Sequence, residues 1–394
     1  MEDQPPAVLP GLERPWEVVA AATGHPFDEG HWRRALAERR VRLEQDWAAP
    51  FFRFSRDCAP AARGSVILRE GYLWDFPHIA RVLHLERGLR RAFAGPFEVE
   101  EKVDGYNVRI VRTGGELLAF SRSGYVCPFA TDRLRELPGL ARLLAERPEL
   151  VACAEVAGPG NPYNVESPPW IERDVRLVVF DLGTLGPRRF LPPAERNALL
   201  ERYGIEGVRR FGVFEPTDAA GVFEVVRQLD AEGCEGVVLK SLDGRVRLKY
   251  VCPGTNARDL RSSAGLLGSV PRSFIINRIV QAAFALHEWE GGGGPERRQA
   301  LGAALLDAML ASIRAVEHGG DLRGFVEERH EIRMHEERHA DRLLAQISRS
   351  ATVQVREESR QREPDGMLRI VLVKRYPRAT GYFQSRLAGG AVED

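Results

Sequence analysis

The stretch Phe-Glu-Val-Glu-Glu-Lys-Val-Asp-Gly-Tyr-Asn-Val-Arg-Ile-Val-Arg occupies residues 97–112 and decides the fold of the chain. Apolar and charged residues alternate from Phe97 to Glu101, and a second pattern of this kind runs from Asn107 to Arg112. Gly105 lies between the two patterns and predicts a turn. We therefore expect two β-strands, with Lys102 at the end of the first.

Lysine is rare in this chain. Of the 56 lysines and arginines, the lysines are Lys102, Lys240, Lys249 and Lys374. An arginine stays protonated and cannot attack an electrophile, whereas a desolvated lysine beside other cations can become a nucleophile. We expect lysine to be kept where arginine fails, and Lys102 is the best candidate for a nucleophile. Taken alone, the short pattern Lys-x-Asp-Gly would also fit a solvated surface hairpin.

Length and composition indicate a cytoplasmic protein of two to four domains. The formal net charge is +0, so a nucleic-acid surface would have to be a local patch. Five widely spaced cysteines without a Cys-x-x-Cys pattern argue against a disulfide framework and a structural zinc site. Since no stretch approaches a transmembrane span or a signal peptide, we expect a soluble protein without a membrane partner.

Predicted strands and helices alternate from Gly64 to about Val251, which indicates a mixed α+β domain. Helical periodicity follows at 273–290 and 295–318, and a third, charged helix is predicted from about 322 to 348. The segments 352–358 and 367–375 predict a β-hairpin. The chain is thus divided into a region of unknown role at 1–62, an α+β domain at 63–256, a helical domain at 257–349 and a small β-rich unit at 350–394.

Acidic, basic and aromatic residues recur at predicted strand ends after Lys102. They lie in Ser121-Arg122-Ser123, Ala154-Glu155-Val156, Val179-Phe180-Asp181, Glu235-Gly236-Val237-Val238-Leu239-Lys240 and Arg247-Leu248-Lys249. In this order and spacing the residues resemble the covalent nucleotidyltransferases, which are ATP-dependent DNA and RNA ligases and mRNA capping enzymes. Glu-Lys-Val-Asp-Gly-Tyr-Asn at 101–107 and the helical domain before a small β tail resemble the archaeal-type homodimeric ATP-dependent RNA ligases.

The resemblance implies an α+β fold. Its nucleotidyltransferase domain would consist of antiparallel β-sheets flanked by helices, followed by an all-helical domain and a small β-rich C-terminal unit. The helical domain would form a homodimer.

The resemblance makes Lys102 the nucleophile that attacks the α-phosphorus of ATP and holds AMP. This attack needs an uncharged amine, and we expect neighbouring cations to lower its pKa. Lys240, Lys249 and Arg247 are the expected cations, and they would also bind the phosphates. Arg247 departs from the usual pair of lysines in this motif: either it replaces the first lysine, or Lys249 is that lysine and has no second.

The resemblance also implies roles for the acidic and aromatic residues of these motifs. Glu155 would accept a hydrogen bond from the ribose, Phe180 would stack on the adenine, and Glu101 would meet the adenine amine. Glu235 is the expected ligand of Mg²⁺ or Mn²⁺, with Asp104 as a second ligand through water, because a hard cation prefers oxygen ligands.

Asn107 and Arg122 match positions that RNA-sealing enzymes use to orient the 3′-hydroxyl end and the phosphates. DNA ligases usually carry arginine near position 107, so Asn107 favours RNA. We therefore predict an ATP-dependent RNA ligase that joins a 5′-phosphate to a 3′-hydroxyl end of RNA. The alternatives are a DNA ligase, a GTP-dependent capping guanylyltransferase and a non-catalytic RNA-binding adaptor.

Three features lie outside this constellation. His335-Glu336-Glu337-Arg338-His339 matches a zinc motif, but its charged surroundings indicate a solvated helix face. The glycine run at 291–294 is interpreted as a linker. Lys374, near the last predicted strand, would either contact pyrophosphate or RNA, or have no role in the site.

Overall fold

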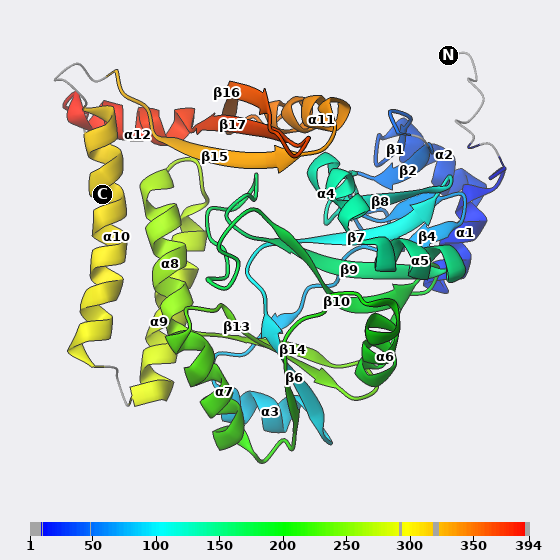
Figure 1. Cartoon of the computed structure of the whole chain (residues 1–394), viewed down its shortest axis with the longest axis horizontal. Helices are drawn as coiled ribbons and strands as arrows, with labels where there is room; N and C mark the ends of the chain where they lie inside the picture. Colours follow the sequence, from blue (N-terminus) through cyan, green and yellow to red (C-terminus); the bar gives the residue numbers. More distant parts are fainter. Residues whose placement is uncertain (1–8, 10, 48, 291–293, 318–322, 391–394) are drawn as a thin grey trace.

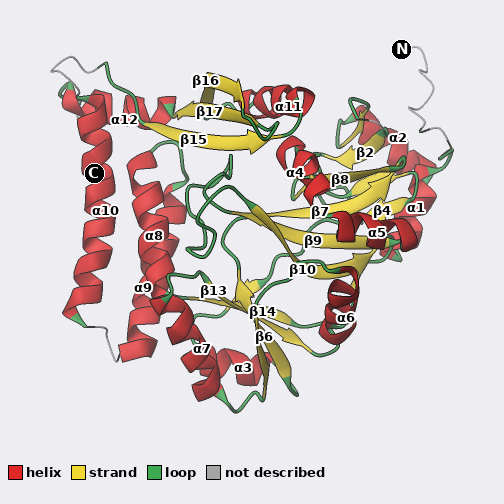
Figure 2. Ribbon diagram, viewed as in Figure 1, coloured by secondary structure: helices red, strands yellow, loops and turns green. Residues whose placement is uncertain are grey.

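The computed structural model describes residues 9, 11–47, 49–290, 294–317 and 323–390. Within these residues the chain forms four β-sheets with helices around them (Figures 1 and 2). The predicted α+β fold of antiparallel sheets, followed by helices and a small C-terminal sheet, is confirmed.

The N-terminal region covers one face of a central sheet. It contains helices α1 (Pro15–Thr23) and α2 (Glu29–Ala37) and a sheet of strands β1 (Val41–Glu44), β2 (Phe51–Phe54), β3 (Val66–Leu68) and β4 (Gly71–Leu73). Its aromatic side chains, such as Phe51 and Phe52, pack with Val111, Val151 and Cys153 of the central sheet. These first residues, which the sequence leaves without a role, therefore complete a hydrophobic core.

The central sheet has the strand order β11-β10-β9-β7-β8. Its strands are β7 (Tyr106–Thr113), β8 (Glu116–Ser121), β9 (Leu150–Ala157), β10 (Arg176–Thr184) and β11 (Arg189–Phe190). Alternate residues of a strand point to opposite faces. Accordingly Ala152 and Ala154 join the core on the side of the C-terminal sheet, whereas Val151 and Cys153 face the N-terminal region. Both faces are buried, which explains the nearly continuous apolar sequence of β9.

A second five-stranded sheet has the order β12-β6-β13-β14-β5. Its strands are β5 (Ala80–Arg81), β6 (Phe97–Lys102), β12 (Arg210–Phe214), β13 (Gly236–Ser241) and β14 (Arg247–Val251). All its pairs are antiparallel except that of β14 with β5. Helices flank both sheets: α3 (Leu85–Ala92), α4 (Pro128–Arg133), the 3₁₀ turn Leu134–Glu136, α5 (Pro138–Glu146), α6 (Pro193–Tyr203) and α7 (Ala219–Ala231).

Helices α8 (Pro253–Ser263), α9 (Arg272–Glu290) and α10 (Pro295–Val316) form the helical unit at one side of the molecule, together with the 3₁₀ turn Ala264–Leu266 (Figure 1). The predicted helix 295–318 ends at Val316, and position 318 lies outside the described residues. By length and composition alone, α10 is long and apolar enough to cross a membrane, and only 17% of its apolar window is buried. The expectation that no stretch approaches such a span is therefore wrong for α10.

The predicted helix from about Leu322 to Ser348 is wrong in its first half, and position 322 lies outside the described residues. Strand β15 (Glu327–Met334) pairs along its whole length with β17 (Leu368–Arg375), which also pairs with β16 (Gln354–Arg362). Only α11 (Glu337–Ser348) is helical, and α12 (Pro377–Leu387) follows the sheet. Ile332 and Met334 are fully buried in the core, and they alternate with charged residues at period two, which is the period of a strand. We propose that the C-terminal unit begins near 327.

The C-terminal sheet is fixed to the central domain through Asp132 of α4, which is 1% exposed. Its carboxylate accepts hydrogen bonds from the backbone amides of His335, at 2.6 Å, and Glu336, at 3.0 Å, and lies 3.0 Å from His339 Nδ1. His335 and His339 thus do not share one helix face, since α11 begins at Glu337. The zinc motif serves here as a contact between two units.

Candidate active site

Lys102 is the last residue of β6, opposite Gly236 of β13. The turn that follows brings β7 against β9 and passes very close to that strand. A Cβ atom at Gly105 would lie 2.4 Å from the carbonyl oxygen of Val156, so glycine is required by this close approach. The turn predicted from the sequence therefore holds Lys102 at the junction of the two five-stranded sheets.

The Lys102 ammonium donates a hydrogen bond to Glu235 Oε2 at 2.5 Å. Burial alone would lower the pKa of Lys102, but the carboxylates of Glu235, Glu155 and Asp104 outweigh it and raise that pKa above its ordinary value. The expectation that neighbouring cations lower the pKa of Lys102 is thus wrong for the free protein. Three acidic groups surround this lysine before any phosphate arrives.

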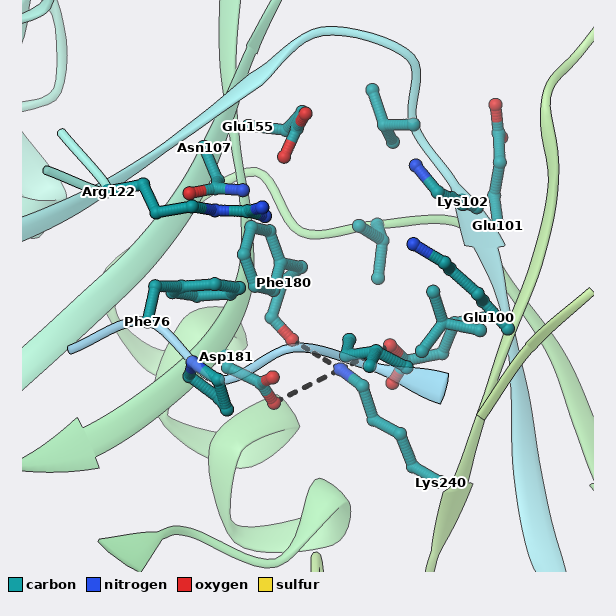
Figure 3. A pocket seen from close by; sticks show the side chains of 16 residues that line it. Phe76, Glu100, Glu101, Lys102, Asn107, Arg122, Glu155, Phe180, Asp181 and Lys240 are labelled. Atoms are coloured by element: carbon teal, nitrogen blue, oxygen red, sulfur yellow. Dashed lines mark hydrogen bonds and ion pairs between the residues drawn. The ribbon is translucent and has the colours of Figure 1, made fainter. Parts of the chain in front are cut away.

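A pocket between the two sheets, here named the adenylate pocket, brings together most of the predicted site residues (Figure 3). They are Glu101, Lys102, Asn107, Arg122, Glu155, Phe180, Lys240 and Lys249. Asn107 lies opposite Glu155 in the pairing of β7 with β9. Figure 3 shows Asn107 and Arg122 close together, apart from Lys102. Asn107 and Arg122 therefore lie at a different part of the pocket from Lys102.

Lys240 lies below Phe180, and its charge is already neutralised by carboxylates. Its Nζ is 2.7 Å from Glu100 Oε2, 3.0 Å from Asp181 Oδ1 and 2.7 Å from the Phe180 carbonyl oxygen. The Phe180 carbonyl also accepts a hydrogen bond from Arg196 at 2.7 Å. Because an ammonium has three donors, Lys240 would have to give up a partner before it could bind a phosphate. Its present role is to fix the backbone of Phe180.

The last predicted motif splits between two locations. Lys249 lines the adenylate pocket, and burial, together with the charge of Lys102, lowers its pKa to about 8. Arg247 does not line this pocket: its guanidinium lies 3.8 Å from the centre of the Phe190 ring and 3.4 Å from Asp181. This placement favours Lys249 as the phosphate-binding lysine of the motif.

Glu101 is held in place by two donors. Its carboxylate accepts hydrogen bonds from the Trp170 indole at 2.8 Å and from Arg209 Nε at 3.0 Å. The side chain is therefore engaged away from any base, and its backbone is the part that remains for the adenine amine.

The carboxylates near Lys102 fit a divalent cation. Burial raises the pKa of Glu155 to about 8, and burial with the nearby charge of Glu235 raises that of Asp104 to about 7. Such carboxyl groups gain from an added cation. Among the described residues no three side chains form a complete metal site. A cation here would complete its shell with water and phosphate oxygens, as Mg²⁺ commonly does.

Two residues that line the adenylate pocket, Phe76 and Glu100, were not predicted from the sequence. Phe76 is 6% exposed and meets Phe180 edge to face, with ring centres 5.8 Å apart. Glu100 lies two residues before Lys102 and binds Arg196 and Lys240. Phe76 belongs to an irregular segment after β4, where no periodicity marks it. Glu100 could have been noticed, because an acid at an inward position of a buried strand needs a partner.

Comparison with known proteins agrees with this geometry. A family model described as RNA ligase matches residues 95–251. A second model, described as the C-terminal region of the Pab1020 ligase, matches residues 263–390. The first segment contains Lys102 and most of the adenylate pocket, and the second contains the units that follow α8.

Similar solved structures span nearly the whole chain. An archaeal ATP-dependent RNA ligase is 30% identical, with a TM-score of 0.86, and the match covers 96% of this chain and 100% of that one. A putative ATP-dependent DNA ligase from Aquifex aeolicus is 34% identical, with a TM-score of 0.85, over 92% and 99%. An uncharacterised protein from Methanocaldococcus jannaschii is 30% identical over 73% of this chain and 75% of its own length.

Proposed function

The chain belongs to the family of archaeal ATP-dependent RNA ligases, and we propose that it seals RNA ends through an AMP carried on Lys102. In the first step Lys102 Nζ, having lost a proton, attacks the α-phosphorus of ATP. A P–N bond forms, the P–O bond to pyrophosphate breaks, and AMP stays on the lysine. The position of Lys102 at the end of β6, inside the adenylate pocket, supports this role.

The pocket supplies the binding of the nucleotide. Phe180 would stack on the adenine, and Phe76 supports the Phe180 ring by an edge-to-face contact. Glu155 would accept a hydrogen bond from the ribose, and Lys249 would neutralise charge that develops on the phosphates. Glu235 and Asp104 would hold Mg²⁺ or Mn²⁺, which polarises phosphate oxygens when bound.

The later steps use the other end of the pocket. The 5′-phosphate of RNA attacks the same phosphorus, the P–N bond breaks, and Lys102 regains a proton. The 3′-hydroxyl then attacks the activated 5′-phosphate, AMP leaves, and a 3′–5′ phosphodiester forms. We propose that Asn107 and Arg122 orient these ends. Arg122 makes no hydrogen bond or ion pair with any described residue, so its guanidinium is available to a phosphate.

The single observation that carries this proposal is that Lys102 shares one pocket with Glu155 and Lys249 and donates a hydrogen bond to Glu235. The test is transfer of label from α-labelled ATP to the protein, with GTP in parallel, for wild type, Lys102→Ala and Lys102→Arg. We expect acid-labile, ATP-selective label that both variants lose. Absence of label on the wild-type protein would favour the adaptor, and preference for GTP would favour a capping enzyme.

A second candidate is DNA sealing, because the Aquifex aeolicus relative is named a putative DNA ligase. Asn107 argues for RNA. Matched RNA and DNA substrates with the same ends separate the two functions, and sealing of DNA alone would overturn the preference for RNA.

We propose that the protein is a homodimer in the cytoplasm and that α9 and α10 form the interface. Large apolar side chains on these helices are exposed at helical spacing: Ile276, Ile279, Val280 and Phe284 on α9, and Leu306 and Leu310 on α10. Leu306 is 58% exposed, which is costly for an isolated chain when neighbouring side chains are also apolar. Sedimentation of Leu306→Glu should give a monomer where the wild type gives a dimer.

A further inference from the structure

Two further cavities continue from the adenylate pocket toward the C-terminal sheet. The first has a volume of about 430 Å³ and shares Asn107 and Arg122 with the adenylate pocket. The second has a volume of about 450 Å³ and shares Tyr163 and Gln346 with the first. The two cavities therefore form one path, here named the strand groove, which leads from the adenylate pocket to Lys374 of β17.

The strand groove contains several aromatic and cationic side chains. They are Tyr106, Tyr125, Tyr163 and Tyr376, with Arg122, Arg349 and Lys374. Among the described residues that line the groove none is acidic, although the whole chain has 56 acidic and 56 basic residues. A groove of one charge attracts a ligand of the opposite charge.

The cations of this groove form no ion pair with the residues that the structure describes. Lys374 is 5% exposed, and its ammonium makes no hydrogen bond or ion pair with any residue that the structure describes. The acidic residue that acts on Lys374 is Glu328, opposite it on β15, but the Glu328 carboxylate already accepts a hydrogen bond from Tyr376 and lies 3.5 Å from His330. Arg349, at the end of α11, likewise makes no side-chain hydrogen bond with the described part of the chain. A buried ammonium without a partner is costly unless a ligand supplies one.

We propose that the strand groove binds single-stranded RNA between the adenylate pocket and the C-terminal sheet, with Lys374 and Arg349 contacting its phosphates. The inference rests on the proposed function, since this strand would be the substrate of the adenylate pocket. Cationic side chains that follow a backbone, together with aromatic rings that stack on bases, are what single strands require. Paired bases in a duplex do not present their faces to such rings. Lys374, the fourth lysine, thereby acquires a role.

The test is direct binding of a fluorescent single-stranded RNA of about eight nucleotides, a length within the usual range for single-strand sites. Anisotropy is measured over a range of salt concentrations for wild type, Lys374→Met and Arg349→Ala. Methionine keeps a long side chain in the buried position without the charge. The matched control is Arg356→Ala: Arg356 is an exposed cation of β16 that pairs with Val373, so it lies on the opposite face of the sheet from Lys374.

We expect each groove variant to raise the Kd about tenfold or more, because each loses a charged hydrogen bond. Each should also reduce the slope of log K against log salt by about 0.7, the value for one phosphate contact on a single strand. The control should match the wild type. Wild-type Kd and slope in both groove variants would overturn the proposal, as would equal affinity for a duplex of the same sequence. Arg349→Ala keeps the test decisive if Lys374→Met does not fold.

Label transfer from ATP to Lys102 is measured on the same preparations and separates the two proposals. If the protein takes up AMP but its affinity for RNA does not depend on Lys374 and Arg349, only the groove proposal is refuted. If the affinity for RNA depends on both residues but the protein takes up no AMP, only the proposed ligase mechanism is refuted.

Discussion

Lys102, the last residue of β6, donates a hydrogen bond to Glu235, the residue before β13, with the ammonium nitrogen 2.5 Å from the carboxylate oxygen. The pair keeps Lys102 protonated in the free protein, since Glu235 is the carboxylate that raises its pKa most. A protonated amine has no lone pair with which to attack phosphorus. The hydrogen bond between Lys102 and Glu235 must therefore break before AMP can be transferred. Binding of ATP, with a cation at Glu235, would break it.

This pair predicts the behaviour of Glu235→Gln. We expect the single-turnover rate of labelling by ATP to fall about 100-fold or more, because the amide cannot replace a carboxylate beside a cation and phosphates. The measurement uses saturating ATP over a range of Mg²⁺ concentrations. Glu206→Gln is the control, since Glu206 pairs with Arg176 on the surface at 3.2 Å. A rate equal to wild type in Glu235→Gln would remove the proposed role of Glu235.

Gly105→Ala should destabilise the protein and misplace Lys102. The new Cβ would clash with the Val156 carbonyl oxygen, and such overpacking typically costs about 1 to 3 kcal/mol. Gly381→Ala in α12 meets nothing within 4 Å and should stabilise by about 0.5 to 1 kcal/mol. Urea unfolding measures both variants. A Gly105→Ala variant as stable as the wild type would contradict the close approach of this turn to Val156.

The strands around Lys102 could be predicted because period-two patterns and glycine turns are local signals. β6 begins and ends at the predicted residues, and the turn at Gly105 follows it. The charged segment before Ser348 misled the prediction because the apolar positions of β15 are few: its burial comes from β17, more than thirty residues later. The partners of Glu100, Lys240 and Asp132 likewise lie far away in the sequence, so their roles could not be predicted from local patterns.

Phe76→Ala should weaken binding of ATP without preventing chemistry. Phe76 lies edge to face with Phe180, and loss of such an aromatic pair costs about 0.5 to 1.5 kcal/mol, or about 2-fold to 12-fold in affinity. Label transfer at several ATP concentrations should show a higher KM with a similar maximal rate. Phe325→Ala, an exposed phenylalanine outside this pocket, is the control. An unchanged KM would exclude Phe76 from the nucleotide site.

Asp132→Ala should loosen the contact between the central domain and the C-terminal sheet. Two backbone amides and the buried His339 would lose their acceptor, at a cost of about 2 to 4 kcal/mol. Hydrogen exchange should increase at residues 335–340 before it increases in the central sheet. Asp243→Ala is the control, because Asp243 makes its hydrogen bonds within an exposed turn. Unchanged protection at 335–340 would contradict the anchoring role of Asp132.

Glu155 and Asp104 predict that the free protein becomes less stable as the pH rises. Their pKa values in the folded chain, about 8 and about 7, exceed those of an unfolded chain, so only the folded state keeps these protons between about pH 4.5 and 8. The free energy of unfolding should therefore fall across this window, by at most about 1.4 kcal/mol per pH unit for each group, and less where solvent screens it. Urea unfolding at pH 5, 6.5 and 8 measures the slope. Glu155→Gln should flatten this slope, whereas Glu206→Gln should keep it. The same slope in Glu155→Gln as in the wild type would show that Glu155 is ionised in the folded protein throughout this range.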